Sequence, residues 1–519
     1  MRAPYTYRYN SIDVREEVIL TQLSHYLREV GVDHDIHDFH LERDTTVADI
    51  LAADPSTIVI AVRETGDNVH YALRLAGHLA GVSSAQIVLY GQTARLRDHP
   101  LVPRGVKLVA HSEADLAQVL GLPTTGPAFA DALRVAPYHD RLPLADWQKL
   151  RLRGTIETSR GCPFPCAFCF INAGRNHGRR WQRQSIDATL ESLATYVDLG
   201  VRAFVFHDSE FMGGTPSDIA HRVALVGALR SGGPQVYFKI YSRADTILKF
   251  PDLDKLHEAG LVSVFMGVES FVQSDLDRLQ KRLSVAAIHD AVRALSDRGI
   301  YMDLSFILFH RCTTIATLRQ NLEAILALYA SDRARLLGMP HFTFSFESTW
   351  RAAATRELSG RTYVGWDVGI KAPAAAGAVF DVELEPLMEV YRLLAYEWSK
   401  KVVALNLARD DAADGEREAI ERWFQGLGAF CARTMLAFLD DFEDGKLTLG
   451  SLDPAREQLF RRVGDYHGVL PLRLRGLATF AEHAGRLDYA DEVALVEPDE
   501  YWSAQIPGPG PHGLIGAAS

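Results

Sequence analysis

The chain has 519 residues, a length that typical domain sizes divide into two to four folded units. Hydrophobic residues make up 47% and charged residues 23%, an ordinary globular composition that excludes a disordered, collagen-like or coiled-coil chain. A net charge of -11 disfavours a protein that binds nucleic acid through its phosphates. Because no window holds the roughly 20 apolar residues that span a bilayer, and the first residues lack a secretory apolar core, we expect a cytoplasmic protein without a membrane partner.

Residues 1–122 alternate between apolar strands and amphipathic helices. Strands are expected at 5–9, 32–40, 56–62, 85–91 and 106–111, with a helix over 16–30. This alternation predicts a doubly wound parallel sheet, whose ligands bind at the carboxyl ends of the strands. Residues 123–150 are rich in proline and turn-forming residues and are predicted to be a linker.

A second alternation of strands and helices covers residues 151–348. Six short apolar strands are expected at 155–159, 203–208, 236–242, 262–270, 300–309 and 342–348, and most of the helices between them end in glycine. Six strand-helix units predict a partial (β/α)6 barrel. Residues 349–519 carry long helical patterns and close in a Pro- and Gly-rich run, so a helical region with a flexible tail is expected there.

Three of the five cysteines, Cys162, Cys166 and Cys169, have a Cys-x3-Cys-x2-Cys spacing directly after the first strand of the second alternation. Three thiolates on one loop can ligate an iron-sulfur cluster and leave one iron open for a small chelating ligand. A structural zinc site completed by His177 is an alternative, but such sites usually consist of two short-spaced pairs. Chance clustering of buried thiols is the other alternative. The remaining two cysteines stand apart and are expected to be structural.

The cysteine motif resembles that of the radical S-adenosylmethionine (SAM) superfamily, which carries it on the loop after the first strand of a partial barrel. The resemblance implies that the three cysteines bind a [4Fe-4S] cluster, that SAM chelates its open iron, and that an electron from an external donor cleaves SAM to a 5'-deoxyadenosyl radical. It also implies cofactor contacts for Phe168, between the last two cysteines, and for Glu269 and Ser270 in MGVES. Arg243 is a further candidate, because its planar fork suits the SAM carboxylate.

A doubly wound domain ahead of such a barrel resembles the cobalamin-binding class of the superfamily, which acts in natural-product and antibiotic biosynthesis. The Asp-x-His-x-x-Gly signature of that class is incomplete here, because Asp35 and His37 are followed by His40 instead of glycine. Many members lack this signature and still bind cobalamin. A cobalamin-binding domain and a purely structural one are therefore both open.

Polar residues at the carboxyl ends of the barrel strands are the candidates for catalysis. Eight of them are expected to share one mouth of the barrel: His207, Asp208, Glu210, Tyr241, Arg243, Glu269, Asp303 and Glu347. The catalytic candidates among these eight are Asp208, Glu210, Tyr241, Asp303 and Glu347. Several carboxylates in one cavity suit a cationic or polyhydroxylated small molecule, such as an amino sugar. For each residue the alternative is a solvated loop position or an internal ion pair.

Two reactions follow from these features. In the first, cobalamin delivers a methyl group to an unactivated carbon of the substrate. In the second, the amino-terminal domain is empty and the substrate radical loses water, which makes the protein a radical dehydratase of an amino sugar with a reductase partner. We prefer the first because it is the commoner activity among chains with this domain order. A non-catalytic iron-sulfur protein is the third alternative.

Overall fold

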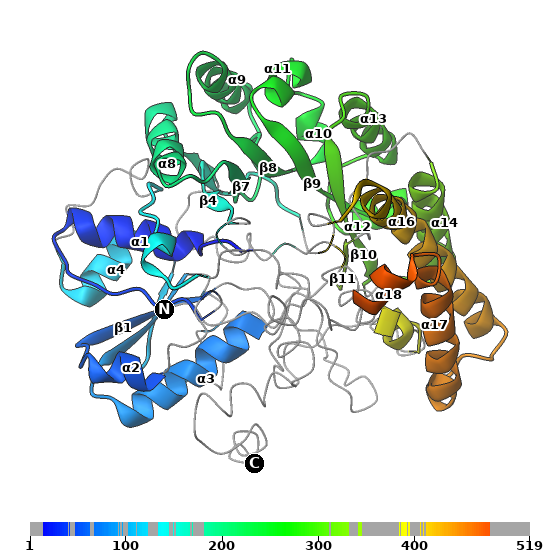
Figure 1. Cartoon of the computed structure of the whole chain (residues 1–519), viewed down its shortest axis with the longest axis horizontal. Coiled ribbons are helices and arrows are strands. Elements are labelled where there is room, and N and C mark those ends of the chain that lie inside the picture. The colour runs from blue at the N-terminus through cyan, green and yellow to red at the C-terminus, as the bar shows by residue number, and fades with distance from the viewer. Residues whose placement is uncertain are drawn as a thin grey trace.

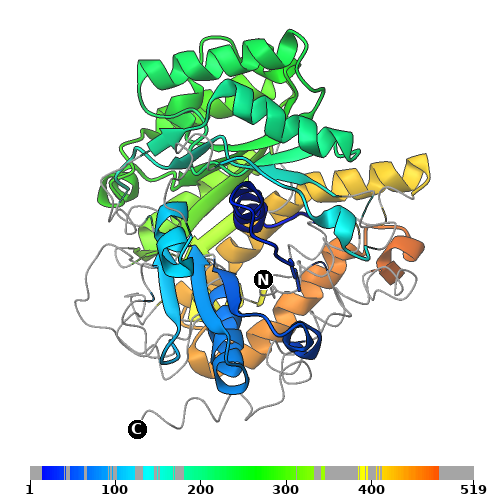
Figure 2. The ribbon, with the colours of Figure 1, turned by 90° about the vertical axis from the view of Figure 1, so that its left-hand side faces the viewer.

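The structure is a computed structural model that describes residues 14–39, 47–62, 67–91, 102–110, 112–122, 133–144, 152–166, 181–310, 313–331, 341–344, 386–391 and 412–477, with a few single positions such as Cys169 between them. Figure 1 shows three parts: a small sheet with its helices in blue, an arc of strands and helices in green, and long helices in orange. Figure 2 shows the blue part stacked beneath the green arc.

The amino-terminal sheet has three parallel strands in the order β1 (Thr57–Val62), β2 (Gln86–Gly91), β3 (Lys107–Ala110). Alternate side chains such as Ile60 and Leu89 pack in one core with α2 (Val47–Ala52) and α3 (Asp67–Val82). Their neighbours, including Val88 and Tyr90, pack in the other core with α1 (Val18–Glu29) and α4 (Glu113–Leu120). Helices therefore cover both faces, which confirms the doubly wound architecture.

The strand expected at 32–40 is wrong for the residues that the structure describes. Residues 32–37 have no regular structure and Asp38 forms only an isolated bridge. Asp38 is buried and accepts a hydrogen bond from the Tyr138 hydroxyl at 2.7 Å, while Phe39 joins the core below the sheet. A run that alternates Asp and His cannot fill a strand buried on both faces, so it packs against the linker instead. The strand expected at 5–9 lies outside the described residues.

The central sheet has six parallel strands in the order β11–β10–β9–β8–β7–β4. They are β4 (Gly154–Ile156), β7 (Ala203–Phe206), β8 (Tyr237–Ser242), β9 (Leu261–Glu269), β10 (Tyr301–Phe309) and β11 (His341–Phe344). Each expected strand is present, and neighbours in sequence are neighbours in the sheet. The sheet curves as an open arc with its helices on the outer side (Figure 1), so the partial barrel is confirmed.

The connecting helices follow the expected order along the chain. They are α8 (Ile186–Asp198), α9 (Pro216–Arg230), α10 (Ala244–Ile247), α11 (Leu253–Glu258), α12 (Gln273–Arg278), α13 (Val285–Ser296) and α14 (Ile315–Tyr329). Thr215 caps α9, and Asp218 returns the hydrogen bond to complete a capping box. This cap fixes where α9 begins, and hence where the loop after β7 must turn.

The carboxyl-terminal part is helical over 412–477, as expected. Helix α16 (Asp414–Glu443) packs along α14, and Arg319 on α14 bonds Asp440 at 2.6 Å. Helices α17 (Leu452–His467) and α18 (Leu472–Leu477) follow. Among the described helices, none is both long enough and apolar enough to cross a bilayer. The domain boundaries at 122, 150 and 348 stay predictions.

The contact between α14 and α16 depends on a glycine. A Cβ on Gly428 would lie 1.9 Å from Cδ1 of Tyr329, so we expect Gly428→Ala to lower the free energy of unfolding by about 1–3 kcal/mol through overpacking. The matched control is Gly464→Ala on α17, where a Cβ meets nothing within 4 Å and should add about 0.5–1 kcal/mol of helix stability. Thermal unfolding followed by circular dichroism compares the two; an unchanged midpoint for Gly428→Ala would contradict the packing.

Candidate active site

A two-stranded ribbon presents the cysteine loop. Strand β5 (Ser159–Gly161) pairs antiparallel with β6 (Trp181–Arg183), and Gly161 lies opposite Trp181. The segment between these two partners carries all three clustered cysteines. The ribbon thus brings both ends of the loop together just beyond the carboxyl end of β4, which is where a barrel places its functional residues.

The cysteines are mostly buried and form no disulfide. Cys162 and Cys166 are buried, Cys169 is half-buried, and the Cys169 amide donates to the Cys166 carbonyl at 3.3 Å. Burial raises the pKa of the Cys162 thiol to about 12, so its thiolate needs a compensating cation or metal. No three His, Cys, Asp or Glu side chains among the described residues stand close enough to hold a single metal ion. Three soft thiol donors on one loop suit an iron-sulfur cluster.

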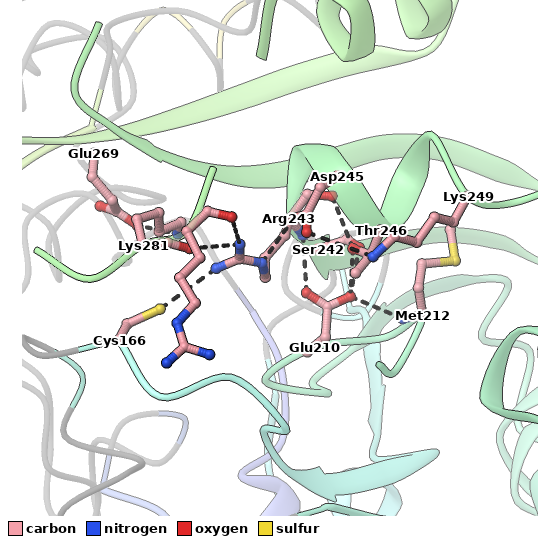
Figure 3. Close-up of polar contacts among 11 residues, drawn as sticks. Cys166, Glu210, Met212, Ser242, Arg243, Asp245, Thr246, Lys249, Glu269 and Lys281 are labelled. Carbon is pink, nitrogen blue, oxygen red and sulfur yellow. Dashed lines mark hydrogen bonds and ion pairs between the residues drawn. The ribbon is translucent and has the colours of Figure 1, made fainter. Parts of the chain in front are cut away.

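Arg243 directs its guanidinium at the cysteine loop. Its Nη1 donates to Cys166 Sγ at 3.5 Å, its Nε to Asp245 at 2.9 Å and its Nη2 to the Lys281 carbonyl at 2.7 Å (Figure 3). The guanidinium also stacks over the Phe164 ring, 4.1 Å from its centroid. Burial lowers the pKa of Arg243, but Asp245 and Cys166 raise it overall. A permanent cation therefore faces a thiol of the cysteine loop.

Glu210 holds the backbone of Arg243 through a hydrogen bond. Its carboxylate accepts hydrogen bonds from the Arg243 amide at 2.9 Å, the Met212 amide at 3.1 Å and the hydroxyls of Ser242 and Thr246 at 2.8 and 3.0 Å (Figure 3). Burial raises the pKa of Glu210 to about 7, although the hydroxyl hydrogen bonds lower it. The carboxylate links the loop after β7 to the first turn of α10, so it holds Arg243 in place.

Asp208 belongs to a buried ion pair beneath the ribbon. It accepts hydrogen bonds from the Thr158 amide at 2.6 Å, Ser159 Oγ at 2.8 Å and Arg222 Nη2 at 3.0 Å. Both members of the pair have side chains that are 0% exposed. The pKa of Asp208 lies above its ordinary value because burial raises it more than the Arg222 guanidinium lowers it. The pair connects α9 to the chain that enters the cysteine loop.

Glu269 and Ser270 lie at the end of β9 and make internal contacts. Glu269 has a left-handed φ of 66°, and its carboxylate accepts Lys281 Nζ at 2.7 Å. A Cβ on Gly267 would stand 2.6 Å from that carboxylate, which explains the Gly-x-Glu spacing. The Ser270 hydroxyl lies 2.9 Å from Asn321 Oδ1 and is buried.

The inner face of the central strands carries a cation among aromatic rings. Lys239 Nζ on β8 lies 2.7 Å from Asp303 Oδ2 on β10. It stands 5.9 and 5.4 Å from the ring centroids of Tyr241 and Phe265, whose own centroids are 5.1 Å apart. Burial lowers the pKa of Lys239, but Asp303 and Tyr241 raise it overall, so the ammonium stays charged.

The expectation of an acidic cavity is therefore wrong for the described carboxylates. Three of the expected acids each have a basic partner, in the pairs Asp208–Arg222, Glu269–Lys281 and Asp303–Lys239. Several unpaired carboxylates in a low-dielectric site would repel each other, and the fold avoids this cost by pairing these three. Glu210 instead accepts hydrogen bonds from two backbone amides and two hydroxyls. Phe168 and Glu347, also predicted as site residues, lie outside the described residues, as does His177.

The basic partners were missed in the sequence. Lys239 carried a usable signal, because it precedes Tyr241 by two residues on one strand and so shares its face. Lys281 and Arg222 carried none, since each reaches its partner from a helix or loop whose position depends on the tertiary fold.

The amino-terminal part contacts the start of the cysteine loop through a partly buried triangle of hydrogen bonds. Gln22 on α1 donates to Glu157 at 3.0 Å, while Arg160 donates to Glu157 at 3.1 Å and to Gln22 at 2.8 Å. Arg160 stands two residues before Cys162. The pKa of Glu157 lies above its ordinary value, because burial raises it more than Arg160 and Gln22 lower it. The first helix of the small domain is thus fixed directly to the entrance of the loop.

Part of the chain is similar in sequence to known proteins. The family model of the radical SAM superfamily matches residues 156–324. The hopanoid C-3 methylase of Methylococcus capsulatus is 26% identical over 191 residues, which are 35% of this chain and 34% of that protein. The 4'-phospho-dehydrooxetanocin synthase of Priestia megaterium is 28% identical over 201 residues, 35% of this chain and 26% of that protein. The chain thus matches about a third or less of these curated relatives.

A solved structure extends the likeness in fold to most of the chain. The cobalamin-dependent SAM radical enzyme OxsB with aqua-cobalamin bound superposes with a TM-score of 0.60 at 15% identity, over 95% of this chain and 81% of that chain. At this identity the likeness concerns the fold. Residues 156–324 of the chain thus match the radical SAM superfamily, and the curated proteins similar to this part of the chain include a methylase.

Proposed function

We propose that the protein is a radical SAM enzyme that removes hydrogen from a small polar metabolite for cobalamin-dependent C-methylation in natural-product biosynthesis. The observation that carries the proposal is the three-cysteine loop, held by the β5–β6 ribbon at the carboxyl end of the barrel and included in the family match. When bound, the [4Fe-4S] cluster and SAM would supply one-electron cleavage of the sulfonium, with the electron coming from an external donor.

The chain's own residues divide the remaining tasks. Cys162, Cys166 and Cys169 would hold the cluster. Asp208 and Glu210, expected as catalytic residues, have their hydrogen bonds within the protein, and we assign them to positioning: Asp208 holds the entrance of the loop and Glu210 holds the turn that carries Arg243. Glu269 and Ser270 are assigned to shaping the end of β9, where SAM would lie.

The inner face of the barrel is the proposed substrate side. Lys239 donates and Asp303 accepts, and a hydroxyl group can pair with both at once. Tyr241 and Phe265 are half-buried and offer flat apolar surface beside that pair. A hydroxyl-bearing substrate suits this face better than the cationic amino sugar expected from the sequence, because the Asp303 carboxylate is already paired with the Lys239 ammonium.

Cobalamin binding by the amino-terminal domain is supported by its doubly wound sheet, whose strand ends are the usual ligand side of such folds. The OxsB structure of similar fold contains aqua-cobalamin, and a curated relative is a methylase. Against it stands the incomplete signature at Asp35 and His37, which favours the radical dehydratase as the second candidate.

An absorbance spectrum separates the two candidates. We expect protein purified anaerobically with cobalamin present to retain about one corrinoid per chain, because the binding domain is folded and tied to the barrel. The Cys162→Ala variant is the matched control: it should keep the corrinoid band and lose the iron-sulfur absorbance. Absence of corrinoid from the folded, iron-loaded wild type would rule out the methyl transfer and favour the dehydratase.

A further inference from the structure

The guanidinium of Arg243 makes hydrogen bonds and a stacking contact within the protein. Its side chain is 6% exposed and its nitrogens donate to Cys166 Sγ, Asp245 and the Lys281 carbonyl, while its flat face rests on Phe164. Phe164 belongs to the cysteine loop itself. Figure 3 shows the guanidinium between Asp245 on one side and Cys166 and Lys281 on the other. Three directions of hydrogen bonding and one stacking surface leave it a single orientation.

This orientation conflicts with the expected role of Arg243 as partner of the SAM carboxylate. Bidentate recognition of a carboxylate uses two parallel N–H groups on one edge of the guanidinium. Here the Nη1 and Nε edges face Cys166 and Asp245, and Nη2 faces a backbone carbonyl. Binding a second carboxylate would require breaking contacts that also hold the loop.

We propose that Arg243 is a positioning residue of the cluster, which donates a charge-assisted hydrogen bond to the Cys166 thiolate and makes the cluster easier to reduce. This inference rests on the proposed function, because it requires a [4Fe-4S] cluster on the three cysteines. Reduction by one electron from the external donor adds one negative charge to the cluster. A fixed cation and a hydrogen bond at a ligating sulfur stabilise the more negative state, so they raise the midpoint potential.

The surroundings of Arg243 explain how the contact persists. Glu210 accepts its backbone amide, and Ser242 and Thr246 keep that carboxylate in place. On the other side, Lys281, whose carbonyl receives Nη2, is anchored by its ammonium to Glu269. The cluster loop is thereby connected to the end of β9 through one arginine.

The test is a redox titration of the reconstituted protein without SAM, followed by electron paramagnetic resonance (EPR). We expect Arg243→Gln to bind about four irons per chain and to need a lower potential for half-reduction, with a shift of at least about tenfold in the reduction equilibrium. Arg243→Lys keeps the charge and should shift less. The matched control is Lys249→Met, which removes an exposed cation 3.8 Å from Asp245 that reaches no cysteine, and its potential should equal that of the wild type.

A second variant and a second readout keep the result decisive. Asp245→Asn retains the arginine but weakens its orientation, so its potential should fall between those of the wild type and Arg243→Gln, even if the latter loads poorly. SAM affinity of Arg243→Gln should stay within about threefold of the wild type. An unchanged potential with a large loss of SAM affinity would overturn the proposal and restore the carboxylate role. A wild type without a four-iron signal would overturn the proposed function itself.

Discussion

Cys162→Ala, Cys166→Ala and Cys169→Ala are each expected to abolish iron-sulfur loading and 5'-deoxyadenosine formation. Each variant removes one of the three thiol donors that the ribbon presents, and two remaining thiolates cannot hold a cluster with one open iron. Iron per chain after anaerobic reconstitution and 5'-deoxyadenosine after addition of reductant and SAM are the two measurements. We expect at least a hundredfold loss of product in each variant, an estimate that follows from losing the reactive centre.

Cys431→Ala is the control for these variants. Cys431 is fully buried in α16, and burial raises the pKa of its thiol well above the ordinary value, so it is an inert core residue. It should load iron and form product like the wild type. Full activity in any variant of the three clustered cysteines, or loss of iron in Cys431→Ala, would contradict the assignment of ligands.

The second large effect is on stability. Arg222→Met is expected to lower the free energy of unfolding by about 3–5 kcal/mol, because it leaves Asp208 as an uncompensated buried charge. The pair also bonds Thr158 at the entrance of the cysteine loop, so the variant should load iron poorly. Urea unfolding of the cluster-free protein measures the stability term without interference from the metal.

A surface pair provides the comparison. Arg230 lies 2.6 Å from Glu258, with side chains that are 37% and 55% exposed. Arg230→Met should cost less than about 1 kcal/mol, because water already screens that pair. If both variants unfold at the same urea concentration, the buried pair does not have the role assigned to it.

Most of the architecture could be predicted from the sequence. Runs such as 203–208 and 300–309 are mostly apolar, which is typical of parallel strands covered on both faces, and the structure has strands at both. The failure at 32–40 has a physical cause: alternating Asp and His resemble a half-buried strand, but the buried position available to Asp38 depends on a hydrogen bond from Tyr138, 100 residues away.

Only part of the site could be predicted from the sequence. The three cysteines could be predicted as ligands because they lie close together in the sequence and one loop carries all of them. Ion pairing was not visible, since Lys281 reaches Glu269 and Arg222 reaches Asp208 only after the barrel has formed. Listing acids at strand ends without their basic partners therefore predicted an acidic cavity that the fold neutralises.

The proposed function requires that the three cysteines hold a cluster with an open iron to which SAM binds. The most direct test is the EPR spectrum of the reduced, reconstituted wild type recorded with and without SAM. We expect the signal of a reduced [4Fe-4S] cluster whose g-values change when SAM is added, because SAM becomes a ligand of the open iron. A four-iron signal that saturating SAM leaves unchanged would contradict SAM binding at an open iron.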